Sequence, residues 1–182
     1  MGKSLSHPLN SKKWNSILLI AFSLSLVALI PNILANPIES GAKRYTDNGD
    51  NTITDNKTGF MWVKMDSYLH SGHWLNWFEI HDYVQKLNEE VFAKYNDWQL
   101  PTMEELKTLY EPEKLNSSQL GSEMKIHIDP IFGKNGTGSL WSANENGRYN
   151  AFGVVFNTGS TFNSNKKSKF RKGTRAVRNK SK

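Results

Sequence analysis

The sequence predicts an α+β domain in which two helices pack on short antiparallel strands joined by long loops. Three observations lead to this prediction. Residues 45–63 are short β-prone runs separated by turn-forming residues. Two amphipathic segments follow, at 76–90 and 102–111, each with a capping signal at its start. Short alternating runs then return between residues 139 and 179.

The first 35 residues have the pattern of a secretory signal peptide. Lys3, Lys12 and Lys13 precede an uncharged apolar run at 16–30, and Ala35 is a small residue suited to cleavage. The run is shorter than the roughly 20 residues of a membrane-spanning helix. We expect an exported protein, periplasmic or secreted, that contacts a membrane only through this segment if it stays uncleaved. The expected parts are a signal peptide (1–35), a leader (36–42), a domain (43–179) and a basic tail end (180–182).

The chain has no cysteine, which excludes disulfides, thiol chemistry and a lipoprotein anchor. After cleavage 147 residues would remain, enough for one domain with its own core. The chain contains 6 Trp, 6 Tyr and 9 Phe, so material for that core is ample.

Positive charge is concentrated at the C-terminal end. The whole chain carries +6, yet residues 36–165 are net −6, and residues 166–182 hold nine Lys or Arg and no acid. One interpretation is a solvated terminus, as runs of like charge usually are. The other is a binding site for a polyanion, such as a sulfated glycan, an anionic envelope polymer, a lipid surface or nucleic acid. We expect no specific recognition of nucleic acid.

The candidate ligand-binding residues lie in this basic region and beside it. A loop before the final strand would present five cations to a polyanion: Lys166, Lys167, Lys169, Arg171 and Lys172. Tyr149, Trp141 and Phe162 have rings that suit the face of a sugar, although core packing is the favoured role of Trp141. Arg175 and Arg178 have an alternative role, as partners of acids in the body of the domain.

The stretch DNGDN, at 47–51, raises the question of a calcium loop. An EF-hand loop needs oxygen ligands at alternate positions, Gly at the sixth and Glu at the twelfth. Neither Asp47 nor Asp50 starts such a pattern. An ion site of another geometry, formed by Asp47, Asp50 and Asp55, is a weaker interpretation than a turn. Asp, Asn and Gly are the residues that turns select. We expect a hairpin turn, Trp62 as a core residue, and no metal or other cofactor.

The segment 76–90 predicts a helix. Apolar residues recur at helical spacing from Trp77 to Val91, and Asn76 with Glu79 forms a capping-box pattern. The preceding residues 66–75 are expected to form a loop containing His70, His73 and several aromatic residues. These histidines and His81 are candidate zinc ligands, but no close pair on one helix face supports such a site, and surface histidines are the favoured interpretation.

The second helix is expected to begin after Thr102, with Glu105 completing another capping box, and to end at Pro112. Neighbouring Glu104 and Glu105 resemble paired catalytic carboxylates, yet adjacent helix positions do not face each other. Residues 113–138 read as a long loop with buried apolar plugs. The strands expected after it are 139–144, the alternating run 151–156, and 173–179.

The order of these motifs resembles a known bacterial family. DNGDNTITDNKTGFMWVK, the Trp77 helix, DWQLPTMEELKTLY, LWSAN and RAVR are similar to the Legionella collagen-like protein C-terminal domain, from about Arg44 to Arg178. The resemblance implies export and a C-type-lectin-like fold, shared with formylglycine-generating enzymes. This chain has Gln99 where the family commonly has Arg, and Asn51 where it commonly has Gly.

The resemblance also implies a function, because the namesake of the family binds sulfated polysaccharides. We therefore expect a non-catalytic binding domain for a sulfated or anionic polysaccharide or another envelope component. The alternative is a structural or protein-binding module of the cell envelope. An enzyme is not expected: the cysteines of formylglycine-generating relatives are absent, and no GxSxG or HExxH motif occurs.

Overall fold

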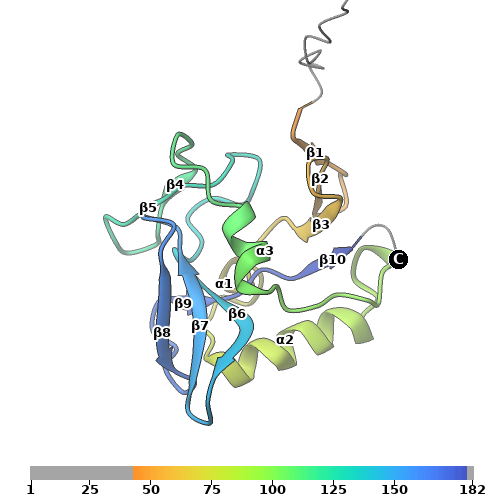
Figure 1. Ribbon diagram of the computed structural model, residues 1–182. Helices are drawn as coiled ribbons and strands as arrows, with labels where there is room; N and C mark the ends of the chain where they lie inside the picture. The colour runs from red at the N-terminus through yellow and green to blue at the C-terminus, as the bar shows by residue number, and fades with distance from the viewer. Residues whose placement is uncertain (1–42, 180–182) are drawn as a thin grey trace, which may run out of the picture. The chain divides into compact units, whose positions relative to one another are not determined.

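The computed structural model describes residues 43–179, which fold into small β-sheets and three α-helices (Figure 1). The mixed α+β class predicted from the sequence is therefore confirmed. The expected signal peptide, leader and tail end lie outside the described residues.

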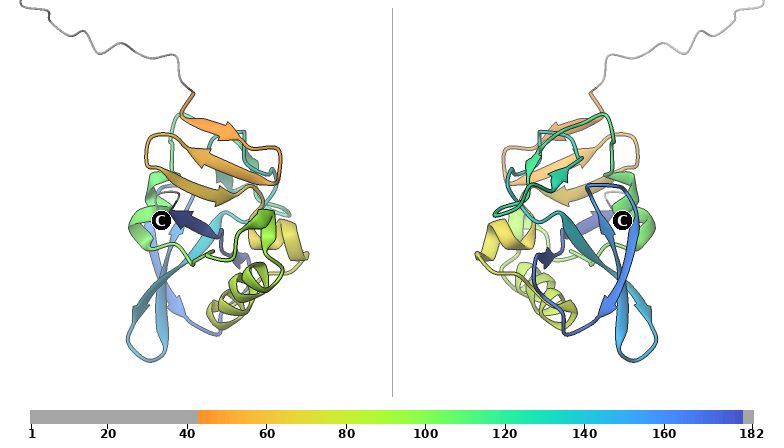
Figure 2. Two further views of the ribbon diagram at one scale, coloured as in Figure 1. Left: turned by 90° about the vertical axis from the view of Figure 1, so that its right-hand side faces the viewer. Right: turned by 90° about the vertical axis from the view of Figure 1, so that its left-hand side faces the viewer.

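The first sheet combines the start of the domain with its end. Its strands run in the order β1-β2-β3-β10, all antiparallel, and Figure 2 shows them side by side: β1 (Tyr45–Asp47), β2 (Thr52–Asp55), β3 (Phe60–Val63) and β10 (Val177–Asn179). Between β1 and β2, Gly49 (φ 78°) and Asn51 (φ 66°) take the left-handed conformation that the turn requires. The hairpin turn and the buried position of Trp62 are confirmed.

The second sheet is built around a long hairpin. Its order is β8-β7-β6-β9, with β6 (Ser139–Asn146), β7 (Asn150–Val155), β8 (Thr161–Asn165) and β9 (Lys172–Gly173). The pair β6–β9 is parallel, which departs from the expected antiparallel pattern. The region 113–138 is not entirely loop, because β4 (Ser117–Ser118) pairs with β5 (Lys125–Ile126).

Both predicted helices are present, although the second ends at Thr108 and not at Pro112 as expected. In α2 (Trp77–Glu89) the side chain of Asn76 accepts from the backbone N–H of Glu79, and Glu79 Oε2 accepts from the N–H of Asn76. Thr102 and Glu105 make the same reciprocal pair at the start of α3 (Met103–Thr108). Within residues 43–179, none of the helices is long and apolar enough to cross a membrane.

Two further local predictions were wrong. Residues 66–75 contain a short helix, α1 (Ser67–Ser71), because Asp66 caps its N-terminus and Gly72 ends it at φ 77°. The segment 173–179 is not one strand: it divides into β9 and β10, which belong to different sheets. Sequence alternation could not show this division, because nearly every residue of the segment is buried.

The core lies between the two larger sheets and under the helices. Its main cluster joins Trp62 of β3 to Leu106 and Leu109 at α3 and to Phe156 after β7. The helix α2 contributes to two smaller clusters, packing Trp77 and Ile80 on Trp141, and Val84 and Leu87 on Trp98. These strands and helices thus bury their apolar side chains in shared clusters, and this burial is the main source of stability in a domain without disulfides.

The segment between β9 and β10 carries a fully buried arginine. Arg175 is 1 % exposed, and its Nη1 donates to the carbonyl oxygens of Val63 (2.8 Å) and Lys64. Its guanidinium carbon also lies 4.8 Å from the ring centroid of Phe132. On either side of Arg175, the backbone is bonded to the first half of the domain: Val63 N–H donates to Ala176, and Ser67 N–H donates to Thr174.

Asp66 is a buried acid whose charge acts on that of Arg175. Its two carboxylate oxygens accept from Leu69 N–H (3.0 Å) and Thr137 N–H (2.7 Å), so one side chain caps α1 and fixes the 133–138 loop. Burial raises the pKa of the Asp66 carboxyl, while the charge of Arg175 and the backbone donors act against this. Gly136 packs directly on the carboxylate, leaving no space for a β-carbon.

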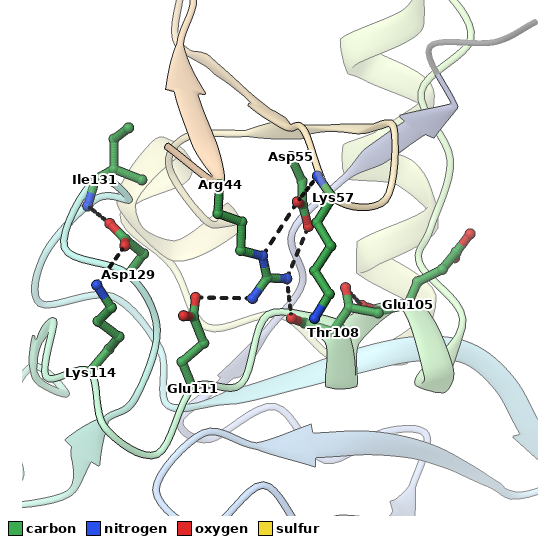
Figure 3. A network of polar contacts seen from close by, with 9 residues as sticks. All are labelled: Arg44, Asp55, Lys57, Glu105, Thr108, Glu111, Lys114, Asp129 and Ile131. Carbon is green, nitrogen blue, oxygen red and sulfur yellow. Dashed lines mark hydrogen bonds and ion pairs between the residues drawn. The ribbon is translucent and has the colours of Figure 1, made fainter. Parts of the chain in front are cut away.

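A second polar network secures the start of the domain (Figure 3). Arg44 forms a two-pronged pair with Asp55 at 3.3 and 3.0 Å, donates to the carbonyl of Thr108 at 2.6 Å, and lies 3.2 Å from Glu111. The Thr108 carbonyl ends α3, where helix carbonyls lack partners within the helix. The first residues of the domain are thereby joined to β2 and to α3.

Arg178 and Gln99 complete the attachment of the last strand. Arg178 pairs with Asp97 at 2.6 and 3.1 Å, which confirms one of the alternative roles expected for the C-terminal arginines. Gln99 exchanges two backbone hydrogen bonds with Val177 and leaves its side chain exposed, between buried Trp98 and half-buried Leu100. In this chain position 99 therefore acts through its backbone.

We predict that Gly136→Ala destabilises the domain strongly. The added methyl group would displace the Asp66 carboxylate, combining overpacking with loss of a helix cap, for a cost of about 3 kcal/mol. Gly49→Ala is the control, because Gly49 has φ 78° and open space around it and should cost only about 1 kcal/mol of backbone strain. Urea unfolding measures both, and equal costs would contradict the role given to Gly136.

Candidate functional site

The basic segment 166–172 connects β8 to β9 and is held in place by its backbone. Lys166 N–H donates to the carbonyl of Tyr149 (2.8 Å), and Trp77 N–H donates to the carbonyl of Lys166 (2.9 Å). At the other end, Leu75 N–H donates to the carbonyl of Lys172 (2.9 Å). The expected connection before the final strand is confirmed, and it rests against the N-terminus of α2 and the β6–β7 turn.

Lys166 departs from the expectation of a free cation. Lys166 is only 5 % exposed. Its ammonium donates to Glu145 Oε2 and, at 3.2 Å, to the carbonyl of Gly147. The ammonium also lies 4.6 Å from the ring centroid of Trp77. Lys166 therefore joins the segment to α2 and β6 and is not available to a ligand.

The other four cations are arranged differently. Lys167 is exposed, and Lys169 is exposed with its Nζ 3.3 Å from Glu79. Arg171 donates to the carbonyl of Gly121 at 2.7 Å. Lys172 is half-buried, with its Nζ 5.8 Å from the ring centroids of both Trp141 and Phe162, and burial lowers its pKa. Lys167 and Lys169 are exposed and, together with half-buried Arg171, form the outer side of the segment, whereas Lys172 lies beside Trp141 and Phe162 on its inner side.

The aromatic candidates also separate into core and surface. Trp141 is fully buried, which confirms its expected core role, and Phe162 packs on it at a centroid distance of 4.9 Å. Tyr149 is 65 % exposed at the β6–β7 turn, where Arg148 lies 5.5 Å from its ring. Because Tyr149 and Lys166 share a backbone hydrogen bond, the exposed Tyr149 ring belongs to the same region as the basic segment.

A groove beside the basic segment was not anticipated from the sequence. It is an open hollow of about 770 Å³ between α1, the start of α2 and the segment 166–172. Its lining residues are Tyr68, Gly72, His73, Trp74, Leu75, Glu79, Asp82, Lys169 and Phe170. The available signal was the aromatic-rich stretch 66–75, but nothing in the sequence places Phe170 beside it.

The carboxylates considered for calcium each have a partner within the protein. Asp47 accepts from Lys64 at 2.6 Å, Asp50 accepts from Thr52, and Asp55 pairs with Arg44. Within residues 43–179, no three His, Asp or Glu side chains are gathered as a metal site would require. Of the histidines, His70 contacts Tyr83, and His81 lies over Trp77 at a centroid distance of 4.3 Å.

The fold and this site describe a small α+β domain whose last strand joins its first sheet and whose basic connection borders an aromatic groove. The family model for the Lcl C-terminal domain matches residues 51–178. Since the match covers more than half of the chain, the chain belongs to this family, and the resemblance noted from the motifs is confirmed. Comparison with curated proteins finds no match.

We predict that Glu145→Ala destabilises the domain more than Lys166→Met. Removing Glu145 leaves a buried ammonium without its counter-charge, which should cost about 1–2 kcal/mol after allowance for the half-exposed Glu145 side chain. Removing Lys166 leaves a carboxylate that water can reach, while methionine keeps the apolar stem packed. The double variant should match Lys166→Met in urea unfolding; additive losses would show that the pair is not coupled.

We also predict a pH dependence that originates at His81. Burial lowers its pKa below the usual 6.5; Lys166 acts in the same sense, while Glu145 and Asp82 oppose the shift. The unfolded chain then binds the proton more readily, so the stability contributed by His81 is present above about pH 6.5 and decreases as the pH falls through the folded-state pKa. Between about pH 7.5 and pH 5 the wild type should lose more stability than His81→Gln. Parallel pH profiles would contradict the prediction.

Proposed function

We propose that this chain is an exported, non-catalytic binding domain with a C-type-lectin-like architecture, whose ligand is a sulfated or otherwise anionic glycan. The export part rests on the sequence of residues 1–35. The architecture is supported by two features: the pairing of the first β-hairpins with the last strand, and helices packed against a second sheet. Membership of the Lcl C-terminal domain family supports the same fold.

The ligand class is inferred from three cations on a fixed connection, of which Lys167 and Lys169 are exposed and Arg171 is half-buried. Lys167, Lys169 and Arg171 lie within five residues of one another, on a segment whose ends are tied to α2 and the β6–β7 turn. A fixed backbone lowers the entropy lost when the cations bind a ligand. Sulfate and carboxylate groups suit both the ammonium and the guanidinium fork.

Two of the five cations that the sequence predicts as ligand-binding have other roles in this proposal. Lys166 is paired in the interior, and Lys172 covers the Trp141 and Phe162 rings with a half-buried stem. The exposed ring of Tyr149 remains a candidate contact at the edge of the basic segment. The non-catalytic part is supported by the position of Asp66, the carboxyl whose pKa burial raises, which lies deep in the core beneath Gly136.

We predict that the purified protein binds a sulfated glycan such as heparin in a salt-sensitive manner. Affinity should fall between about 50 and 150 mM salt, because exposed charges are screened over about 10 Å. Changing Lys167, Lys169 and Arg171 to Gln should weaken binding at low salt by roughly a hundredfold, taking about 1 kcal/mol for each cation.

The matched control removes three exposed lysines elsewhere, Lys57, Lys86 and Lys134, each changed to Gln. Both triple variants have the same net charge, so a difference between them reports position and not total charge. Equal losses in the two variants would show a nonspecific charge effect. Absence of salt-sensitive binding by the wild type would contradict the polyanion proposal and favour the protein-binding alternative.

A further inference from the structure

The groove beside the basic segment has a chemistry of its own. Tyr68 and Trp74 stack with ring centroids 3.9 Å apart and planes at 16°. Phe170, 69 % exposed, comes from the basic segment and lines the same hollow. Rings from α1, from the α1–α2 connection and from the 166–172 segment therefore meet at one surface, which offers flat apolar area to a ligand.

The polar lining of the groove is acidic on balance. Glu79 uses Oε2 to accept from Asn76 N–H (2.7 Å) and Oε1 to pair with Lys169 (3.3 Å), so its charge is compensated. Asp82 lies one turn further along α2 and is exposed. Within residues 43–179, the structure shows no hydrogen bond or ion pair at the Asp82 carboxylate. Glu79, Asp82 and Lys169 together give the groove a net charge of −1.

This balance distinguishes the groove from the outer side of the segment. A sulfate placed in the groove would face the carboxylate of Asp82, and like charges in a confined site repel. A hydroxyl group would instead find an acceptor in Asp82 and a donor in Lys169. The stacked rings meanwhile favour a ligand with one apolar face.

We infer that the groove is a subsite for an uncharged sugar ring, which stacks on the Tyr68–Trp74 and Phe170 rings and whose hydroxyl groups donate hydrogen bonds to Asp82. A pyranose ring has this combination, with C–H bonds on its faces and hydroxyls around its rim. The inference rests on the proposed glycan-binding function and refines it. The domain would bind a polymer that carries both anionic and unmodified sugars, with Lys169 at the boundary between the two subsites.

The test uses three uncharged probes: cellohexaose, maltohexaose and chitohexaose. Each is titrated into the purified protein up to about 10 mM, a concentration that detects weak binding, while the backbone and indole N–H signals are followed by NMR. We expect at least one probe to shift the signals of Trp74 and Phe170. The binding should be insensitive to salt, because no net charge is neutralised.

The variants separate the groove from the basic segment. Trp74→Ala and Asp82→Asn should each weaken binding of the uncharged probe by about tenfold, while Trp74→Phe should retain most of it. Phe78→Ala is the matched control, since Phe78 is a half-exposed aromatic on α2 that does not line the groove. Asp82→Asn changes an exposed side chain, so it tests the subsite even if Trp74→Ala unfolds the protein.

The outcomes for the groove and for the proposed function are distinguishable. Lys167→Gln with Arg171→Gln should weaken heparin binding and leave the uncharged probe unaffected. Heparin binding without any response to the three probes would overturn the groove inference alone. Binding of oligolysine at the groove in place of the sugars would also overturn it, because the acidic lining would then select a cation. If the wild type binds neither heparin nor any of the uncharged probes, the proposed function is overturned as well.

Discussion

The burial of Arg175 is the constraint on which the rest of this domain depends. A guanidinium that is 1 % exposed needs acceptors and a nearby opposite charge, because an uncompensated buried charge costs several kcal/mol. The acceptors of its Nη1 are the carbonyls of Val63, the last residue of β3, and of Lys64, and the compensating charge is Asp66 at the start of α1. The position of one side chain therefore fixes where the last segment passes between the two larger sheets.

The passage of this segment between the two sheets also fixes the positions of the surrounding loops. Asp66 reaches Leu69 and Thr137 at once, so α1 and the loop before β6 are set by the same carboxylate. Upstream of the crossing, β9 pairs with β6 and places the 166–172 segment against α2. The backbone that carries the cations and lines the groove is thus held in position by contacts in the interior of the domain. Preorganisation of this kind lets a small surface bind with little loss of conformational entropy.

The surface divides its charges between two tasks. Glu145 pairs with the buried Lys166 and Glu79 with the exposed Lys169, while Lys167 and Asp82 are also exposed. In the proposed function, long-range attraction is supplied by the outer cations and selectivity by the aromatic groove. The two contributions differ in salt dependence, since screening weakens exposed charges far more than stacking contacts. In that proposal, one small domain combines affinity for a polyanion with recognition of particular sugar units.

The sequence by itself determined the local features: the 48–51 turn, both capping boxes, the buried Trp62, and the family to which the chain belongs. These depend on neighbouring residues, whose spacing along the chain fixes their geometry. Only the tertiary structure decided that Lys166 is buried, that 173–179 divides between two sheets, and that Phe170 joins Trp74 in one groove. Each of these outcomes arises from contacts between residues far apart in the chain. Charge and hydrophobic pattern describe what a side chain prefers, but its partners are set by how the whole chain packs.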